Sequence, residues 1–218
     1  MIVINQNVKI LSPSEDEGLA CPKAIEYAAR NCYASQDKIT DDSWSTMVPN
    51  LISRGHEAPV EFADMTVDIT TSRAILAELT RHRVASFCVE SQRYIQEDKT
   101  GDITFIRPTW CQDSDEDDRS AMWYSSMRMA ELAYKNLIED GAKPQEAREV
   151  LPNSTACRII MKANLREWRH IFALRCSVAA YPPMRELMLN LLFQAHARIP
   201  AVFDDLYQEY FEQKEVDG

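Results

Sequence analysis

The chain has 218 residues, and 45% of them are hydrophobic, which is enough to bury the core of one large domain or two small ones. Its 24 basic and 34 acidic residues give a net charge of −10, which repels nucleic acid and anionic membranes at long range. We therefore expect no nucleic-acid or membrane partner, and any anionic ligand needs a local basic pocket. No linker, repeat, signal peptide or membrane-length apolar run is visible, so we expect a single domain over residues 1–218.

The cysteines and glycines narrow the choice of ligand further. Six cysteines are scattered without a C-x-x-C pair or metal-ligand spacing to histidine. We interpret them as reduced thiols of a cytoplasmic protein and expect no metal site. The five glycines are not spaced as in G-x-G-x-x-G or in a P-loop. A bound nucleotide would therefore be held by side chains and helix ends.

The N-terminal half mixes alternating and helical patterns. Its predicted elements are a strand over 2–11, helices over 23–34 and 43–54, a strand over 62–70, a helix over 72–81, a partly loop-like segment over 82–96, and a short strand over 103–107. The strand over 62–70 has the clearest pattern. Apolar Met65 and Val67 alternate with polar Thr66 and Asp68, which predicts a strand with one buried and one solvated face.

The C-terminal half is predicted to be mainly helical. The acidic run 113–118 indicates a turn and the start of a long helix, since carboxylates stabilise a helix N-terminus. Five apolar residues share one face of that helix: Met122, Met129, Leu132, Ala133 and Leu137. The later elements are a short helix over 144–150, a break at 151–153, a strand over 154–162, a helix from 164 to about 175, a helix over 184–197 with an apolar face, and a last helix after Pro200.

These elements alternate irregularly and form no regular βαβ units. We therefore expect the α+β class, with a mixed or antiparallel sheet packed with helices.

Three segments concentrate residues suited to chemistry, and they hold three of the four histidines: 56–61, 81–94 and 164–175. The segment 81–94 begins with R-H-R in an otherwise acidic chain. Arginine forks match phosphate and carboxylate oxygens in pairs, so this cluster indicates an anionic ligand. The apolar residues Val84, Phe87, Cys88 and Val89 predict that the same segment enters the core.

The segment 164–175 combines a helix start with charge. Asn164 and Glu167 form a capping-box pattern, and Arg166 and His170 lie one turn apart on one face. A helix N-terminus also supplies backbone donors to phosphate. Each segment has a purely structural interpretation too: a surface turn at 56–61, a solvated basic helix end at 81–94, and a core helix with outward charges at 164–175. The segments taken one by one leave both interpretations open.

Taken in order, the segments resemble the flavin-dependent thymidylate synthases across nearly the whole chain. The motifs are H-E-x-P-x-E at 56–61, R-H-R-x7-S-x-R-Y at 81–94, R-x-x-L-P at 148–152, and N-x-R-x3-H-x3-L-R at 164–175. The resemblance implies methylation of dUMP to dTMP, with methylenetetrahydrofolate as carbon donor and NADPH as reductant through bound FAD. It also implies a homotetramer whose active sites are shared between subunits.

The resemblance also implies residue roles. The dUMP site is assigned to Glu78, Arg81, Ser91, Gln92, Arg93, Arg148 and Arg175, with Arg148 reaching it from a neighbouring subunit. The FAD site is assigned to Ala58, Glu61, Arg81, His82, Arg83, Val89, Asn164, Leu165, Arg166 and His170. The expected catalytic residues are Arg175, which favours ionisation of the pyrimidine at N3, Ser91, which binds phosphate, and His56, near the reacting ring.

The chain departs from the family pattern at a few positions: Ala58 replaces a hydroxyl residue, Cys88-Val89 replaces Asn-Glu, Gln92 replaces Gly, and Ala179 lies near the place of a histidine. One alternative hypothesis is therefore a flavin- or nucleotide-binding protein of the same fold without synthase turnover. Another is an acidic helical protein whose R-H-R segment binds a carboxylate-rich partner. Cys88 is expected to be dispensable for the chemistry.

Overall fold

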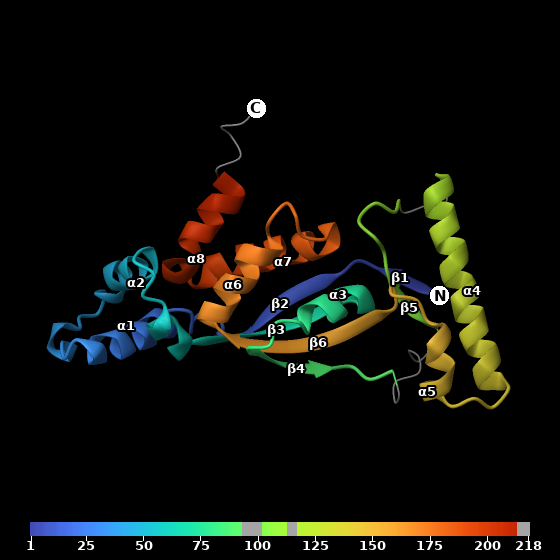
Figure 1. Cartoon of the computed structure of the whole chain (residues 1–218), viewed down its shortest axis with the longest axis horizontal. Helices are drawn as coiled ribbons and strands as arrows, with labels where there is room; N and C mark the ends of the chain where they lie inside the picture. Colours follow the sequence, from blue (N-terminus) through green and yellow to red (C-terminus); the bar gives the residue numbers. More distant parts are fainter. Residues whose placement is uncertain (93–101, 113–116, 213–218) are drawn as a thin grey trace. The chain divides into compact units, whose positions relative to one another are not determined.

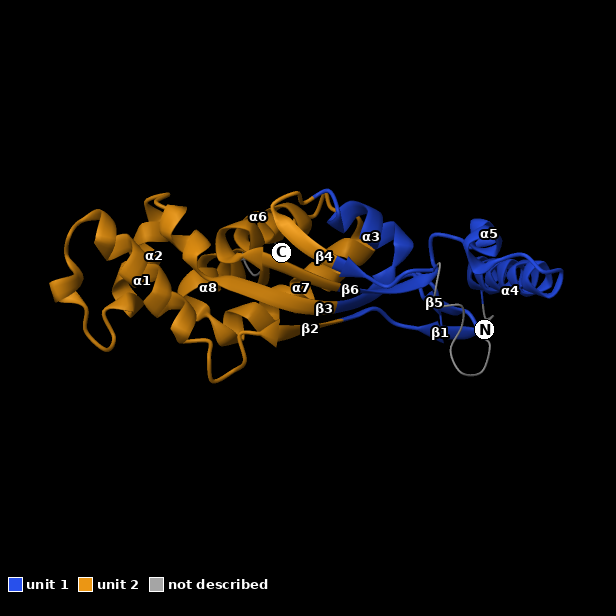
Figure 2. Cartoon of the chain, turned by 90° about the horizontal axis from the view of Figure 1, so that it is seen from below, with its two compact units in different colours: residues 1–7, 69–81, 88–159 blue, residues 8–68, 82–87, 160–218 orange. Residues whose placement is uncertain are grey.

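The computed structural model describes residues 1–92, 102–112 and 117–212 (Figure 1). The chain divides into two compact units, and Figure 2 shows them in two colours. The first unit comprises residues 1–7, 69–81 and 88–159, and the second comprises 8–68, 82–87 and 160–218. Each unit is assembled from three separate stretches. The expectation of a single domain over 1–218 stays a prediction.

The strands form two sheets. A parallel pair joins β1 (Ile2–Ile4) to β5 (Thr104–Ile106), and the four-stranded sheet has the order β2-β3-β6-β4, with β2 (Asn7–Ser12), β3 (Asp64–Ser72), β6 (Ala156–Asn164) and β4 (Ala85–Val89). An antiparallel bridge between Phe105 and Thr155 adds the second kind of pairing. The expected α+β class with mixed pairing is confirmed.

The single strand expected over residues 2–11 is instead two strands in different sheets. Between them, Asn5 accepts two hydrogen bonds from the Arg107 guanidinium at 3.1 and 2.9 Å, next to the hydrogen bond from Arg107 N to Ile4 O. The alternating sequence pattern does not reveal that β1 and β2 pair with different strands, because side chains alternate with a period of two residues in both.

The eight α-helices of the described residues follow the predicted order: α1 (Ala20–Cys32), α2 (Trp44–Ser53), α3 (Arg73–Leu79), α4 (Asp118–Glu139), α5 (Pro144–Ala147), α6 (Leu165–Arg175), α7 (Pro182–Arg198) and α8 (Pro200–Tyr207). Proline opens α5, α7 and α8, where its fixed φ fits and its missing N–H costs nothing. Gly55 follows α2 with φ +69°, a conformation that glycine adopts without strain. None of the described helices has the length and apolar character needed to span a membrane.

The core of the second unit is built on α6. Trp168, Ile171 and Phe172 are fully buried, as in the structural interpretation of the segment 164–175, and α6 packs against α7 and α8. The Trp168 indole donates a hydrogen bond to the Met65 carbonyl of β3 at 2.9 Å. Arg169 makes a two-pronged ion pair with Asp205 of α8, with both contacts at 2.7 Å. These contacts hold α6 in one orientation.

The core of the first unit is built on α4. The apolar face that the sequence predicts on this helix exists, but it does not face the core. Trp123, Met127 and Tyr134 of α4 are buried together with Phe105. The face predicted from sequence is instead the outer one, because its large side chains are exposed: Met122 71%, Met129 63%, Leu132 50% and Leu137 37%. We call these four residues the α4 stripe.

Two predictions of burial were wrong. The segment after the R-H-R motif does not carry its apolar side chains into the core, since Val84 is 63% exposed and Cys88 is exposed. The reason is that β4 is an edge strand of the four-stranded sheet. Conversely, Asp68, predicted on the solvated face of β3, is only 5% exposed and pairs with Lys9 at 3.5 Å.

Candidate functional site

The N-terminus of α6 organises the candidate site. Asn164 ends β6 and caps α6, and its side-chain oxygen accepts a hydrogen bond from the Glu167 amide at 2.8 Å. Asparagine is favoured at this position because its side chain satisfies an amide that the helix leaves unpaired. The predicted helix start is confirmed, and it fixes where the residues of the first turns of α6 point.

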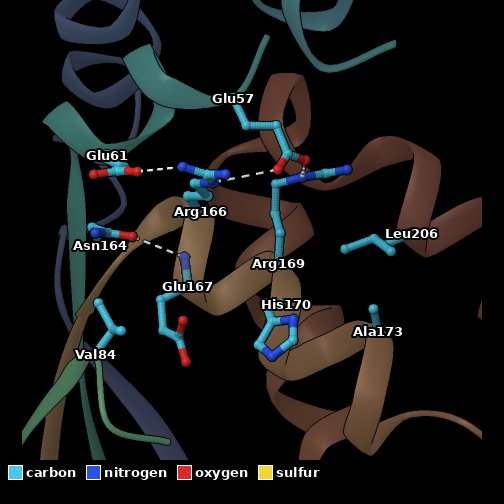
Figure 3. Close-up of a pocket in the computed structure, with 10 residues that line it drawn as sticks. All are labelled: Glu57, Glu61, Val84, Asn164, Arg166, Glu167, Arg169, His170, Ala173 and Leu206. Atoms are coloured by element: carbon cyan, nitrogen blue, oxygen red, sulfur yellow. Dashed lines mark hydrogen bonds and ion pairs between the residues drawn. The ribbon is translucent and has the colours of Figure 1, made fainter. Parts of the chain in front are cut away.

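A hollow of about 570 Å³ lies along α6, and Figure 3 shows the residues that line it. They come from the segment 56–61, from the loop before β4, and from α6 and α8: Glu57, Glu61, Val84, Asn164, Arg166, Glu167, Arg169, His170, Ala173 and Leu206. We call this the α6 hollow. It brings parts of all three predicted segments to one place in the second unit.

The upper part of the hollow in Figure 3 is a charge network. Arg166 pairs with Glu61 at 2.6 Å and with Glu57 at 3.5 Å, and Arg169 lies 3.7 Å from Glu57. The hydrogen bond to Glu61 raises the pKa of Arg166 above its ordinary value. Arg166 is thus a permanent cation held in place by carboxylates.

A second cluster joins the R-H-R motif to the end of α6. His82 is only 6% exposed, and its Nε2 accepts a hydrogen bond from Arg175 Nε at 3.1 Å. Its Nδ1 lies 3.5 Å from a Glu167 carboxylate oxygen, and its ring meets the His170 ring edge-on at 6.3 Å between centroids. Burial first, and then Arg175 and His170, lower the pKa of His82 to about 4. His82 is therefore neutral at physiological pH.

Three other predicted flavin or catalytic residues of the second unit line separate hollows. His56 is exposed and lines one of about 550 Å³ with Arg30 and Arg54. Ala58 lines an apolar one of about 540 Å³ with Tyr27 and Phe62. Arg83 lines a polar one of about 420 Å³ that also contains Lys162 and shares Glu61, Val84 and Asn164 with the α6 hollow.

Of the remaining predicted site residues, Leu165 is buried in the second unit, and the described others belong to the first unit. Leu165 is fully buried, and its amide donates to the Ala63 carbonyl at 2.9 Å, so its side chain anchors the start of α6. In the first unit Glu78 is half-buried and Arg81 exposed after α3, and the Arg81 amide donates to the Glu78 carbonyl at 3.2 Å.

The other first-unit residues follow β4 and α5. Val89, Ser91 and Gln92 are half-buried at and after the end of β4. Arg148 is half-buried in the 3-10 turn after α5, with its Nε 3.9 Å from Glu149. Arg93 lies outside the described residues.

Sequence reasoning missed several residues that line the hollows, above all Glu57, Glu167, Arg169 and Lys162. Glu167 was identified only as part of a capping pattern. Its position three residues before His170 places both on one helix face, and that spacing is the signal that was available. Lys162 gave no signal, because the other charged residues of its hollow, Glu61, Asp64 and Arg83, are distant in sequence.

The arrangement suits an anionic ligand of some length. Arg83, Lys162 and Arg166 lie around Asn164, and the first turn of α6 carries the positive end of the helix dipole. Lys162 pairs with Asp64 at 3.2 Å and Arg166 with Glu61 at 2.6 Å, so an anion would share these two cations with carboxylates. The His82 cluster, which we define as His82, Glu167, His170 and Arg175, adds a fixed guanidinium at the other end of α6.

Comparisons with known proteins show which family the chain resembles. The family model described as thymidylate synthase complementing protein matches residues 20–201. A flavin-dependent thymidylate synthase of Geobacter sulfurreducens is 34% identical over 84% of this chain and 80% of its own length. A probable flavin-dependent thymidylate synthase of Mycobacterium phage D29 is 32% identical over 84% and 83%, and one of Haloarcula marismortui is 29% identical over 95% and 96%.

Among solved structures, a UMP/dUMP methylase, PolB, from Streptomyces cacaoi with bound 5-Br dUMP has the same fold. The TM-score is 0.77 over 96% of this chain and 98% of that one, at 21% identity. The match of the family model to most of the chain, together with the relatives above 30% identity, shows that the chain belongs to the flavin-dependent thymidylate synthase family.

Proposed function

We propose that this protein methylates dUMP to dTMP, with methylenetetrahydrofolate as carbon donor and NADPH as reductant through bound FAD. The observation that carries the proposal is the meeting of two family motifs that lie 93 residues apart. His82 of the R-H-R motif and Arg175 of α6 share a hydrogen bond of 3.1 Å. Such a contact is a specific arrangement, because His82 is buried and neutral and orients a cation instead of being exposed to solvent.

The residues around the α6 hollow fit FAD. A dinucleotide carries a pyrophosphate, and Arg83, Lys162 and Arg166 with the N-terminal turn of α6 form the set of donors that binds such a group without a glycine-rich loop. We assign Asn164, Arg166 and His170 to the flavin site, with Glu61 holding Arg166 in place. When bound, FAD supplies the redox chemistry that links NADPH to reduction of the transferred carbon.

We assign Arg175 the central role toward dUMP. A fixed cation beside the pyrimidine stabilises the negative charge that develops when N3 loses its proton, and the ring carbon C5 becomes a better nucleophile. His82 contributes by accepting from Nε, which restrains the plane of the guanidinium. Because His82 is neutral, it adds no positive charge that would repel Arg175.

Glu78, Arg81, Ser91, Gln92 and Arg93 are assigned to dUMP by the family motif. Arginines match the phosphate, and Ser91 with adjacent backbone amides adds hydrogen bonds to it. The roles of His56 near the reacting ring, and of Ala58, His82, Arg83, Val89 and Leu165 in the flavin site, are proposed on the same ground.

We also propose the homotetramer, with Arg148 reaching the dUMP site of a neighbouring subunit. The α4 stripe supports it, because four large apolar side chains on one exposed helix face are unusual in a protein that stays monomeric. A second copy of the chain would bury them.

The test is product formation. The purified protein is mixed with FAD, NADPH, methylenetetrahydrofolate and dUMP, and dTMP is sought by mass spectrometry, with each component omitted in turn. We expect dTMP only in the complete mixture. A protein that binds FAD and dUMP but forms no dTMP would support the alternative of a binding protein without turnover, and attention would move to Ala58, Cys88 and Val89. A protein that binds neither would contradict the assignment of the site as well.

A further inference from the structure

Glu167 is a carboxylate with two different neighbours. Its backbone amide belongs to the cap of α6, where it donates to Asn164. Its side chain points away from the pair formed by Arg166 and Glu61 (Figure 3), and one carboxylate oxygen lies 3.5 Å from Nδ1 of His82. The side chain of Glu167 is 13% exposed and that of His82 6%. A carboxylate that is so little exposed and lies beside an imidazole nitrogen is not simply a solvated surface charge, and its effect on the histidine has to be considered.

The hydrogen bond on the other side of the ring shows which tautomer of His82 is present. The Nε of Arg175 always carries a hydrogen, so the Nε2 of His82, at 3.1 Å, must present a lone pair. A neutral imidazole with a lone pair on Nε2 carries its proton on Nδ1. That proton faces the acceptor oxygen of Glu167. Glutamate, histidine and arginine thus lie in a row, with a hydrogen bond from Arg175 to one ring nitrogen of His82 and the Glu167 carboxylate 3.5 Å from the other.

We propose that Glu167 is a positioning residue, which acts through His82 to hold the guanidinium of Arg175 at the angle needed beside the pyrimidine. The proposal rests on the proposed function, since it concerns the same site. In the chain of contacts Glu167 selects the Nδ1–H form of His82, and that form is the only neutral one that can accept from Arg175. A carboxylate that orients an imidazole in this way is a recurring arrangement, in which the acid acts through the histidine and not on the substrate.

A simpler role for Glu167 is stabilisation of the helix. It lies in the first turn of α6, where any negative charge interacts well with the helix dipole. The two roles differ in what they require. The helix dipole interacts only with charge, so replacing Glu167 by glutamine or by alanine should lower helix stability equally. Orientation of His82 requires an acceptor oxygen, so glutamine should preserve part of that orientation and alanine none.

The first experiment therefore compares Glu167→Ala with Glu167→Gln, and both with Asp204→Ala. Asp204 pairs with His196 at 3.1 Å in the same unit, so its variant removes an acid–histidine pair outside the site. We expect Glu167→Ala to lower kcat at saturating dUMP by about ten- to a hundred-fold, as for a misplaced reacting group. Glu167→Gln should lose less than about tenfold, and both should still bind FAD. Asp204→Ala should keep its turnover.

A double variant tests whether Glu167 acts through His82. If it does, Glu167→Ala adds little to the loss already caused by His82→Ala, because the contact is absent in both. A double variant whose loss of kcat equals the product of the two single losses would overturn the proposal. So would equal losses in Glu167→Ala and Glu167→Gln, or turnover of Glu167→Ala that matches Asp204→Ala.

A direct measurement separates this proposal from the proposed function. Protein labelled with ¹⁵N-histidine reports by NMR which ring nitrogen carries the proton, and His82→Asn identifies the His82 signals by their loss. We expect the proton on Nδ1 in the natural chain and a mixture of forms in Glu167→Ala. A proton on Nε2 in the natural chain would overturn the positioning role. This result does not depend on turnover, so it stands even if the protein forms no dTMP.

Discussion

The helices α6 and α4 are both amphipathic, and the sequence identifies an apolar face on each. On α6 that face, with Trp168 and Phe172, is buried within the unit. On α4 the Met and Leu stripe is exposed, and the core contacts are made by Trp123 and Tyr134 on the opposite side. Helical period shows which residues lie together. Which face of the helix is buried depends on the elements from the rest of the chain that pack against it.

The difference has a physical origin. The outer face of α6 is charged, so only one orientation buries its apolar side without also burying Arg166. On α4 both sides are apolar, so periodicity alone does not choose between them. Aromatic side chains carry more area per residue and pack into the first unit, which leaves the stripe for another surface.

The largest effect should come from the buried face of α6. Trp168→Ala removes a fully buried indole and its hydrogen bond to β3, and we expect a loss of about 3–5 kcal/mol in the free energy of unfolding. Met129→Ala on the α4 stripe should change the unfolding free energy of the isolated chain by about 0.5 kcal/mol or less. Urea unfolding at low, matched protein concentrations measures both. Equal losses would contradict the contrast between the two helices.

The arginine in the last turn of α6 should respond in catalysis and not in folding. Arg175→Ala should lower turnover by about 10²–10³-fold, the usual cost of removing one preorganised donor to a developing anion. FAD binding should persist, since we assign Arg175 to the pyrimidine. Arg128→Ala on the exposed part of α4 is the control for loss of an arginine. Near-normal turnover of the Arg175 variant would remove that residue from the mechanism.

Buried His82 should make stability depend on pH. Its pKa is about 4 in the folded protein against an ordinary value of 6.5, so the unfolded chain binds more protons between these values. Stability from this group is present above pH 6.5 and is lost as pH falls toward 4, with about 2 kcal/mol lost at pH 5. Glu167, His170 and Arg175 of α6 face the ring.

The measurement is urea unfolding at pH 7 and pH 5 for the natural chain and for His82→Asn, which cannot titrate. The natural chain should lose more stability than the variant over this range. The same loss in both would show that other groups cause it.

The outer face of α4 should respond in assembly. Leu132→Lys places a charge in the apolar stripe, so we expect the proposed tetramer to give way to smaller species in size-exclusion chromatography with light scattering. Arg128→Glu, an exposed change on the same helix outside the stripe, is the control. A Leu132→Lys protein that stays tetrameric would place the subunit contact elsewhere.

The smallest effect should be at Cys88. This side chain is exposed on an edge strand, and nothing in our mechanism uses its thiol. We expect Cys88→Ala to fold, bind FAD and turn over within about twofold of the natural protein, since surface changes rarely cost more than about 0.5 kcal/mol. A folded, flavin-binding variant without product would make the thiol part of the chemistry.

Much of the secondary structure could be predicted, because its signals are local. The cap at Asn164, the prolines that open α7 and α8, and Gly55 after α2 act on their own neighbours in the chain. The split of the first strand at Asn5 could not be predicted, because the partner, Arg107, lies about a hundred residues away.

The candidate site divides in the same way. Motif order and spacing were enough to identify the family, and they predict a site set of arginines and histidines that includes Arg166, His170 and Arg175. The pairing of His82 with Arg175, the depressed pKa of His82 and the place of Glu167 depend on how the loop before β4 lies against α6. Local residue patterns carry information about helix ends, faces and motifs, whereas desolvation and hydrogen-bond partners come from residues far apart in sequence, and they exist only once the chain has folded.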